Sequence, residues 1–334
     1  MHAVQQMVYV GETPWHKLGT RFVGTENFDE WMTAAGFGWD AQIKPLFYNA
    51  NHATLPGSTV PVALKTHKLL VRSDTQMELG VVGKDYKVVQ PKQVMEFFRD
   101  IAFSSNSRYK METAGCLFDG KRVWALARTQ NEIRIQGQDV ILPYLLLGTG
   151  FDGTISTFAS YTSVRVVCHN TLSMAIGTNG LKADIRIPHS STFDENSIKS
   201  ALGLIEGAEE AAMQNFEETA NTLAGRKVDD KDMFSFFAKL YGPKPEEGKS
   251  YKDITIGEFT DSQKGNINEL IRLFKSGPGA TLRSAESTAW GLVNAVTHFE
   301  DSKRDNVRGL ASSQFGAGSK RKLSAVTQGL ALAA

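Results

Sequence analysis

The sequence has few cysteines, no long apolar run and no excess of charge of one sign. Its two cysteines, Cys116 and Cys168, are too few for a disulfide framework and lie in no CxxC pair, which favours a reducing compartment. The longest nearly uninterrupted apolar run, residues 140–147, contains Pro143 and is far shorter than the ~20 residues that cross a bilayer. The first residues lack the basic and apolar segments of a secretory signal. We therefore expect a cytoplasmic protein with no membrane partner.

What the sequence does contain is the composition of an ordinary globular protein. Of 334 residues, 41% are hydrophobic and 10% are aromatic, with 30 glycines and 10 prolines. This is enough apolar material for one large elaborated domain or two smaller ones. The same figures exclude collagen, coiled coils and disordered chains.

The net charge of +1 hides a segregation of charge along the chain. The net charge is −2 for residues 1–38, +5 for 39–190, −7 for 191–302 and +5 for 303–334. Basic segments on either side of an acidic one favour a polyanionic partner such as nucleic acid, and a solvated surface of uneven charge is the alternative. An acidic block packed against a basic surface of a second copy would also give a homo-oligomer.

Residues 39–188 contain short β-branched and aromatic runs separated by turn signals. Asp119-Gly120 and Asp152-Gly153 are the clearest of these signals, because Asp-Gly supplies the positive φ angles of a tight hairpin. Three pairs of runs predict hairpins: residues 108–118 with 121–128, 142–150 with 154–161, and 64–72 with 77–82. Sequential hairpins predict an antiparallel sheet, interrupted by one helix that begins at Pro91.

After residue 188 the pattern becomes helical. Thr192 and Glu195 match a capping box, and the apolar spacing that follows predicts one long amphipathic helix that ends at Gly225. Further helices are predicted at about residues 230–241, 262–276 and 284–300. Beyond Lys303 the chain is rich in small and basic residues, which predicts a mobile tail.

These elements predict an α+β fold: an antiparallel sheet with long β-hairpins, followed by a mainly helical C-terminal part and a basic tail. The predicted boundaries are a β-rich α+β domain at residues 1–190, an acidic helical region at 191–302 and a basic flexible tail at 303–334.

The glycine-rich motifs do not predict a nucleotide cofactor. Residues 148–153 read GTGFDG, a literal GxGxxG, but a dinucleotide site needs that loop to open a helix. Residues 154–158 are strand-like, so we assign these glycines to a hairpin turn. Residues 80–85 lack both the spacing and the hydroxyl of a Walker A loop. No cofactor is therefore expected.

Catalytic and metal motifs are equally weak. Cys168 and His169 are the residue types of a thiol protease, but adjacent strand residues point to opposite faces, so we expect Cys168 to be a buried apolar residue. The seven histidines show no zinc-site spacing. The pairs Asp229-Asp230 and Glu300-Asp301 sit in polar contexts at helix ends and are expected to be solvated rather than to form an acid/base pair. No catalytic residue and no metal ligand is predicted.

Basic residues interleaved with aromatics on the predicted hairpins are the strongest functional signal. Cations for phosphates beside flat rings for bases make a platform for a single strand. On the strand from Lys121, residues Arg122, Trp124 and Arg128 share one face by the period of two. The alternative is that Trp124 faces the core while the cations rim the sheet. The predicted nucleic-acid-binding residues are Lys65, Lys68, Arg72, Lys110, Lys121, Arg122, Trp124, Arg128, Arg165 and, in the tail, Lys320, Arg321 and Lys322.

Two motifs carry a family resemblance. Residues 165–172 read RVVCHNTL, and residues 14–20 read PWHKLGT. They resemble the "RVVCxNTL" and "PWHxLG" signatures of the domain of unknown function 932 group, over roughly residues 1–300. The resemblance implies a protein of a phage or another mobile element in the cytoplasm of a bacterial host, and it carries over no catalytic residue.

The sequence thus favours a non-enzymatic nucleic-acid-binding protein of phage or plasmid DNA metabolism. Single-stranded DNA is the favoured partner, with binding or annealing in recombination or replication as the role, and a homo-oligomer is compatible with the charge pattern. Two alternatives stay open. One is an enzyme with an unfamiliar site near Cys168 and His169, and the other is a protein-interaction module that uses the helix from Thr192.

Overall fold

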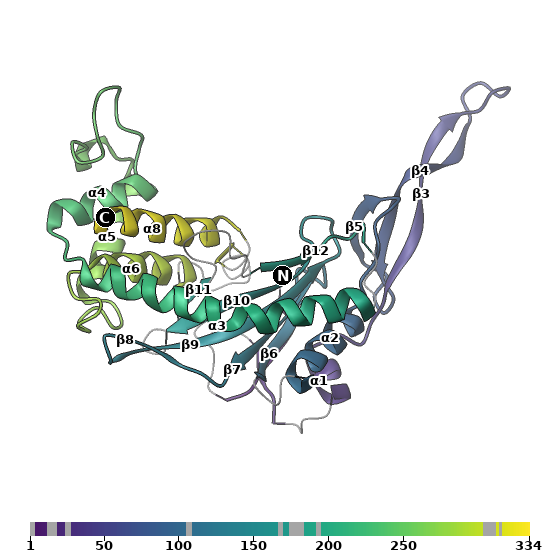
Figure 1. Cartoon of the computed structure of the whole chain (residues 1–334). Helices are drawn as coiled ribbons and strands as arrows, with labels where there is room; N and C mark the ends of the chain where they lie inside the picture. The colour runs from purple at the N-terminus through teal and green to yellow at the C-terminus, as the bar shows by residue number, and fades with distance from the viewer. Residues whose placement is uncertain are drawn as a thin grey trace.

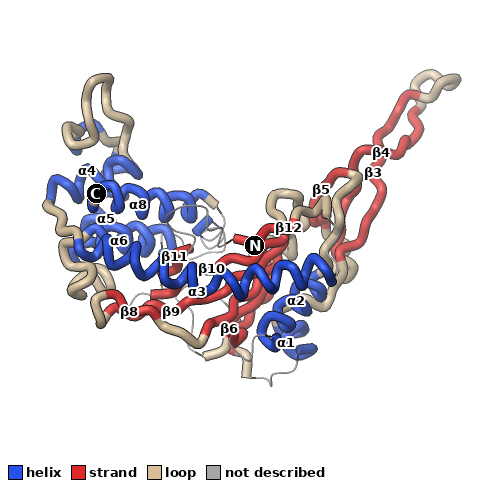
Figure 2. Tube along the Cα trace, in the orientation of Figure 1, coloured by secondary structure: helices blue, strands red, loops and turns tan. Residues whose placement is uncertain are grey.

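Figure 1 shows the computed structural model of the chain: a twisted sheet with helices gathered at one end and a β-hairpin arm projecting from the other. The structure describes residues 4–11, 19–23, 28–104, 109–165, 170–173, 184–191, 195–302, 312–313 and 316–334. The predicted α+β class is confirmed, with antiparallel strands first and helices toward the C-terminus (Figure 2). The three predicted domain boundaries stay predictions.

The main sheet has the strand order β11-β10-β9-β7-β6-β1-β2, with β12 added to β10 and β8 added to β9. Its pairs are antiparallel except for β1 with β2. The strands are β1 (Val4–Tyr9), β2 (Thr20–Arg21), β6 (Tyr109–Leu117), β7 (Arg122–Thr129), β8 (Ile133–Ile135), β9 (Asp139–Gly150), β10 (Thr157–Arg165), β11 (Asn170–Ser173) and β12 (Asp184–Ile187). Two predicted hairpins are therefore confirmed as β6–β7 and β9–β10.

The turns and glycines of these hairpins have local physical reasons. Asp119 and Gly120 both have positive φ, 58° and 95°, as the Asp-Gly signal predicts. Gly148 lies inside β9, where a Cβ atom would come within 2.8 Å of the Phe158 ring. The glycines of residues 148–153 therefore serve strand packing and a turn, which confirms that they are not a dinucleotide loop.

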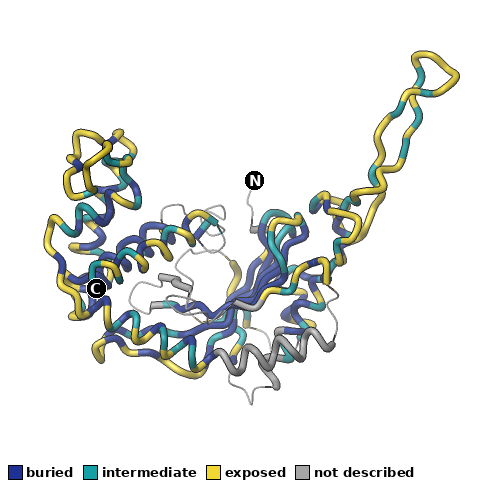
Figure 3. The backbone as a smooth tube through the Cα atoms, turned by 45° about the horizontal axis from the view of Figure 1, so that its top comes forward, coloured by how far each residue is buried: buried dark blue, intermediate teal, exposed yellow. Residues whose placement is uncertain are grey.

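A second, three-stranded sheet has the order β3-β4-β5, with β3 (Ala41–Asn51), β4 (Thr59–Arg72) and β5 (Glu78–Gly83). The β4–β5 hairpin is the third one predicted from the sequence, whereas β3 was not predicted as a strand. β5 pairs with β4 only from His67 to Val71, so the distal halves of β3 and β4 form a two-stranded ribbon. We call residues 41–72 the arm, and Figure 3 shows it exposed along most of its length.

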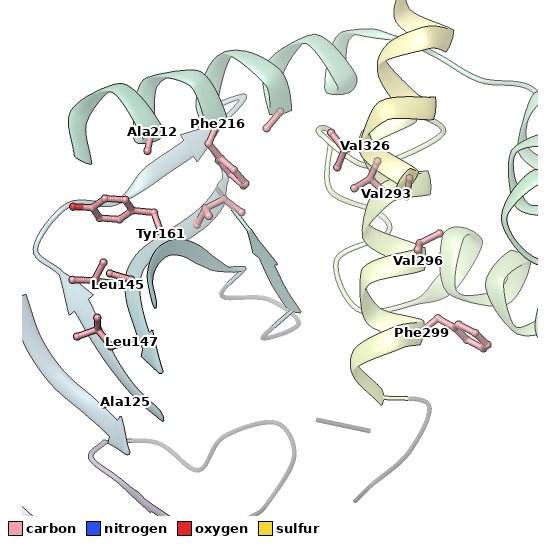
Figure 4. Packing of buried hydrophobic residues seen from close by; sticks show 14 of the residues in the cluster. Ala125, Leu145, Leu147, Tyr161, Ala212, Phe216, Val293, Val296, Phe299 and Val326 are labelled. Carbon is pink, nitrogen blue, oxygen red and sulfur yellow. The ribbon is translucent and has the colours of Figure 1, made fainter. Parts of the chain in front are cut away.

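Helices cover one face of the main sheet: α1 (Phe28–Ala34), α2 (Pro91–Ser104) and α3 (Glu195–Gly225). Alternate residues of the central strands, such as Leu145 and Tyr161, point into the core beneath α3 (Figure 4). α3 contributes Ala212 and Phe216 to this core. The predicted start at Pro91 and end at Gly225 are confirmed, and the capping residue Thr192 lies outside the described residues.

The helical end consists of α4 (Asp230–Tyr241), the 3-10 turn η1 (Ile256–Glu258), α5 (Asp261–Ser276), α6 (Ala289–Ser302) and α8 (Ala317–Ala333). The Asp229 side chain caps α4, and Thr260 with Gln263 forms a capping box on α5. α6 begins five residues later than predicted, because residues 284–287 form turns and Thr288 forms a β-bridge with Lys227. Its residues are buried nearly all round, so α6 is the centre of this part.

The predicted mobile tail is wrong for residues 317–333, which form α8 and pack against α6. Lys322 is only 4% exposed, and its ammonium lies 2.7 Å from Asp301 and donates to Ser313. Glu300, predicted to be solvated like Asp301, is also buried, with Arg321 3.3 Å away and the Tyr241 hydroxyl donating to it. A buried carboxylate needs such a cationic partner, so the basic residues of α8 hold the helix in place.

Candidate nucleic-acid interface

The aromatic residue predicted for the β6–β7 hairpin is part of the protein interior. Trp124 is 8% exposed and packs with Met7, Leu117, Leu146 and Phe158 on the sheet face opposite the main core. The neighbouring Val123 and Ala125 belong to the main core, so the predicted alternation is confirmed. Trp124 as a stacking platform is wrong, because a buried ring presents no face to a base.

The arginines of that hairpin are engaged with acidic neighbours. Arg122 donates to the Thr154 hydroxyl at 3.1 Å and lies 3.9 Å from Asp152. Arg128 lies 3.8 Å from Glu112, which accepts a hydrogen bond from Tyr144 at 2.7 Å. Burial raises the pKa of Tyr144 far above its usual value, so the tyrosine stays a donor. Both arginines therefore have carboxylates beside them, with which a phosphate would have to compete.

Arg72 is a structural residue at the root of the arm. It is 5% exposed, forms a two-pronged contact with Asp74 at 2.9 and 2.7 Å, and lies over the Trp39 ring at 4.5 Å. The arginine holds the pKa of the Asp74 carboxyl below its usual value. The predicted role of Arg72 in binding a phosphate is wrong, because burial and the ion pair occupy its guanidinium.

The remaining predicted cations do not gather into one patch. Lys110 is exposed at the start of β6 and Lys121 is half-buried at the β6–β7 turn, each without an ion pair in the described parts of the chain. Arg165 ends β10, and its side chain lies outside the description. Lys320 is exposed on α8, whereas Arg321 and Lys322 beside it pair with acidic residues of α6.

The arm brings together what the predicted hairpin does not. Residues 41–72 include four Lys and Arg side chains and no Asp or Glu. Phe47 and Tyr48 are 59% and 53% exposed on β3. Lys44 and Lys65 are exposed without an ion pair among the described residues, while Lys68 donates to the Tyr86 carbonyl at 2.7 Å. The arm therefore presents cations and ring faces to solvent together.

Successive strand residues point to opposite faces, so Phe47 and Tyr48 place one ring on each side of the ribbon. Phe47 lies opposite Ala63 and Tyr48 opposite Val62, and within the described part of the chain no third strand flanks them. The sequence signal that could have identified this site is the run from residue 41 to residue 73 without an acidic side chain, with two adjacent aromatics inside it. Lys65 and Lys68 are among the residues that the sequence predicted to bind nucleic acid, whereas Lys44 and the two rings are not.

A pocket of about 400 Å³ opens where the arm joins the main sheet. It is lined by Thr66, Gly83, Lys84, Asp85, Tyr86, His189 and Ser190. The Tyr86 and His189 rings stack in it, with centroids 4.3 Å apart and planes inclined by 19°. Burial lowers the pKa of His189, so its ring is neutral at neutral pH.

The enzyme alternative stays a prediction. Cys168 and His169, the residues of the enzyme alternative, lie outside the described residues. Burial raises the pKa of Cys116 to about 12, so this thiol is not a nucleophile at neutral pH. Within the described ranges, no group of three His, Cys, Asp or Glu side chains could hold a metal ion, and no helix is long and apolar enough to cross a membrane.

The described half of α3 also argues against the interaction-module alternative. Phe216, Ala220 and Leu223, on its apolar stripe, are buried within the chain, with the Phe216 ring 6.1 Å from that of Trp290. The Tyr109 hydroxyl donates to Glu209 at 2.6 Å, which also holds the helix on the sheet. This stripe is therefore used inside the molecule.

Comparison with known proteins gives a family and no activity. Neither curated proteins nor solved structures yield a match. The sequence model of one family matches residues 78–326, about three quarters of the chain. The match begins at the first residue of β5, so it includes six of the seven pocket residues, while β3 and β4 precede it. The chain belongs to the family described as Domain of unknown function (DUF932).

Proposed function

We propose that the chain binds single-stranded DNA along the arm, as a non-enzymatic protein of phage or plasmid DNA metabolism in a bacterial cytoplasm. The observation that carries the proposal is the exposure of Phe47 and Tyr48 on a ribbon with free lysines and no carboxylate. The phage or plasmid setting rests only on the motifs at residues 14–20 and 165–172.

The chemistry of the arm suits a single strand better than a duplex. Aromatic side chains stack on bases whose faces are free, and each such stack contributes about 1–3 kcal/mol. In a duplex those faces are covered by neighbouring base pairs. Lysine ammonium groups such as those of Lys44 and Lys65 attract phosphates at any sequence, so the binding is expected to be tolerant of sequence.

A salt titration of binding tests the proposal. We expect a fluorescein-labelled dT30 strand to bind tightly at low salt, with affinity falling as salt rises by about 0.7 log units per log unit of salt for each neutralised phosphate. Changing Lys44→Gln and Lys65→Gln together should reduce that slope by about 1.4. Anisotropy at several salt concentrations measures both affinity and slope.

The matched control is Lys110→Gln with Lys320→Gln, because these two lysines are also exposed and unpaired among the described residues but lie outside the arm. The control pair should leave the slope unchanged. Absence of binding at low salt overturns the proposal, and equal losses in the two double variants remove the arm from the site. Light scattering with and without dT30 tests whether the protein is a homo-oligomer.

A further inference from the structure

The pocket at the root of the arm has walls from three separate segments that backbone hydrogen bonds join. The Lys84 amide donates to the Thr66 carbonyl at 3.0 Å, which ties the loop after β5 to β4. The Lys87 amide donates to the His189 carbonyl at 2.5 Å, which ties the same loop to the segment after β12. The hollow is thus built into the junction between arm and sheet.

Its aromatic wall is held in a fixed orientation. The Tyr86 hydroxyl donates to the Gly150 carbonyl at 2.6 Å. The two ring nitrogens of His189 lie 3.1 Å from the Lys87 carbonyl and 3.2 Å from the Ile155 carbonyl. Contacts at both ends of the stacked pair keep the rings from turning away, so a flat ligand would meet a wall already in place.

The polar lining adds groups of both signs. Lys84 and Asp85 are exposed, and neither has an ion pair among the described residues. Thr66 and Ser190 add hydroxyl groups. A volume of about 400 Å³ lies at the small end of the range for small-molecule sites. Flat rings, a free ammonium and a free carboxylate in a hollow of this size match one nucleotide.

We propose that this pocket takes one nucleotide of the strand that lies on the arm. The base packs against the half-buried Tyr86 ring, which the buried His189 ring backs. The Lys84 ammonium meets a phosphate, and the Asp85 carboxylate accepts hydrogen bonds from base N–H groups. The inference rests on the proposed function, since it places one unit of the same bound strand. It goes further by naming a base-capture site that is separate from the stacking rings of the arm.

The test is to fill the pocket without removing a charge. A Cβ atom added at Gly83 meets nothing within 4 Å, so the fold accommodates Gly83→Leu, and its side chain occupies space that lines the hollow. The matched control is Gly265→Leu in α5, where an added Cβ atom also meets nothing within 4 Å. Circular dichroism and thermal melts check that both variants fold, and Ser190→Leu is a second way to fill the pocket.

The probe is a set of dT12 strands, each with a single 2-aminopurine at a different position, because the fluorescence of this base falls when it stacks. With the wild-type protein and with Gly265→Leu, we expect quenching at one position beyond that due to the arm. Gly83→Leu and Ser190→Leu should lose that quenching and weaken binding about 5- to 150-fold, the contribution of one stacked base. The salt slope should fall by at most about 0.7, one phosphate contact.

Three outcomes separate this inference from the proposed function. If the wild-type protein binds dT12 but the filled variants quench every position equally well, the pocket is not a base site and the arm proposal stands. If the filled variants lose the quenching but keep the binding that depends on the arm, both the pocket inference and the proposed function are supported. If the wild-type protein binds no strand at low salt, the proposed function fails and this inference fails with it.

Discussion

The arm and the β6–β7 hairpin have similar compositions and opposite environments. Both carry lysine or arginine beside aromatic side chains. In β6–β7 the ring of Trp124 is buried and the two arginines lie beside carboxylates, whereas Phe47, Tyr48 and Lys65 of the arm face solvent. Composition alone therefore identifies a basic, aromatic hairpin. Whether its side chains stabilise the fold or are available to a ligand depends on the residues that pack around them.

The difference follows from the position of each hairpin in its sheet. β6 and β7 lie between β1 and β9, so their side chains meet neighbours on both flanks. The arm has no third strand beyond His67, and an isolated two-stranded ribbon is only marginally stable in water. Apolar groups held exposed on such a ribbon add nothing to the protein's own core, and under the proposed function they contact the bound strand.

The largest expected effect is on stability, where the aromatic residues of the two hairpins should differ. Trp124→Ala should lower the free energy of unfolding by about 3–5 kcal/mol, since it leaves a cavity in a buried cluster. Tyr48→Ala should change it by no more than about 0.5 kcal/mol, because that ring is exposed. Urea denaturation followed by circular dichroism measures both. Equal losses in the two variants would show that the arm ring is structural too.

The next effect is on binding, where substitutions in the arm should have the larger effect and a substitution of Trp124 the smaller one. Tyr48→Ala and Phe47→Ala should each weaken binding of dT30 by about 1–3 kcal/mol, the contribution of one stacked base. Trp124→Phe, which keeps a buried ring, should bind like the wild-type protein. Anisotropy at one low salt concentration measures the three affinities. A loss of affinity in Trp124→Phe without a loss in the arm variants would indicate that the binding site lies on β6–β7.

A smaller effect distinguishes paired from free cations. Arg128→Gln removes a partly exposed ion pair with Glu112, so we expect a change in stability of at most about 1 kcal/mol. Its salt slope for dT30 should equal that of the wild-type protein, whereas Lys65→Gln should lower the slope by about 0.7. The same titrations provide the measurement. A lower slope for Arg128→Gln would mean that DNA displaces Glu112 from the arginine.

The sequence predicted the elements whose signals are local. Asp119-Gly120 and Pro91 mark a turn and a helix start through one or two side chains, and the structure has elements there. β3 was missed because its partner β4 begins beyond a seven-residue loop, and its side chains are mostly exposed without an apolar alternation. Strand pairing of that kind depends on contacts that no short window contains.

The tail shows that basic residues in a sequence can hide the buried face of a helix. Lys322, Ala325, Val326 and Gly329 are buried at the spacing of one helix face, and this stripe was present in the sequence. Because Lys322 lies within the stripe, the segment was predicted to be exposed to solvent. Its partner Asp301 is 21 residues away and was itself predicted to be solvated. Burial matters at the candidate site as well. Lys65 and Lys68 were predicted from residue type alone and stay predictions, whereas Arg72 and Trp124, predicted in the same way, are buried.

The smallest effect concerns the junction where the arm meets the sheet. Burial lowers the pKa of His189 below the ordinary value of 6.5, whereas His67, on the arm, is exposed. The unfolded chain therefore takes up a proton that the folded chain excludes as the pH falls through 6.5 toward the lowered value, and stability is lost in that window. We expect the melting temperature of the wild-type protein to fall between pH 7.5 and 5.5 more than that of His189→Gln.

The matched control is His67→Gln, which should keep the full pH dependence because the exposed His67 side chain lies on the arm, away from the buried His189 ring. The charged residues around the junction are Lys84, Asp85 and Lys87, and all three proteins keep them. Identical pH profiles for all three proteins would mean that His189 is solvated in the folded state. The Tyr86–His189 wall would then be loose, and the junction would be as open to water as the arm itself.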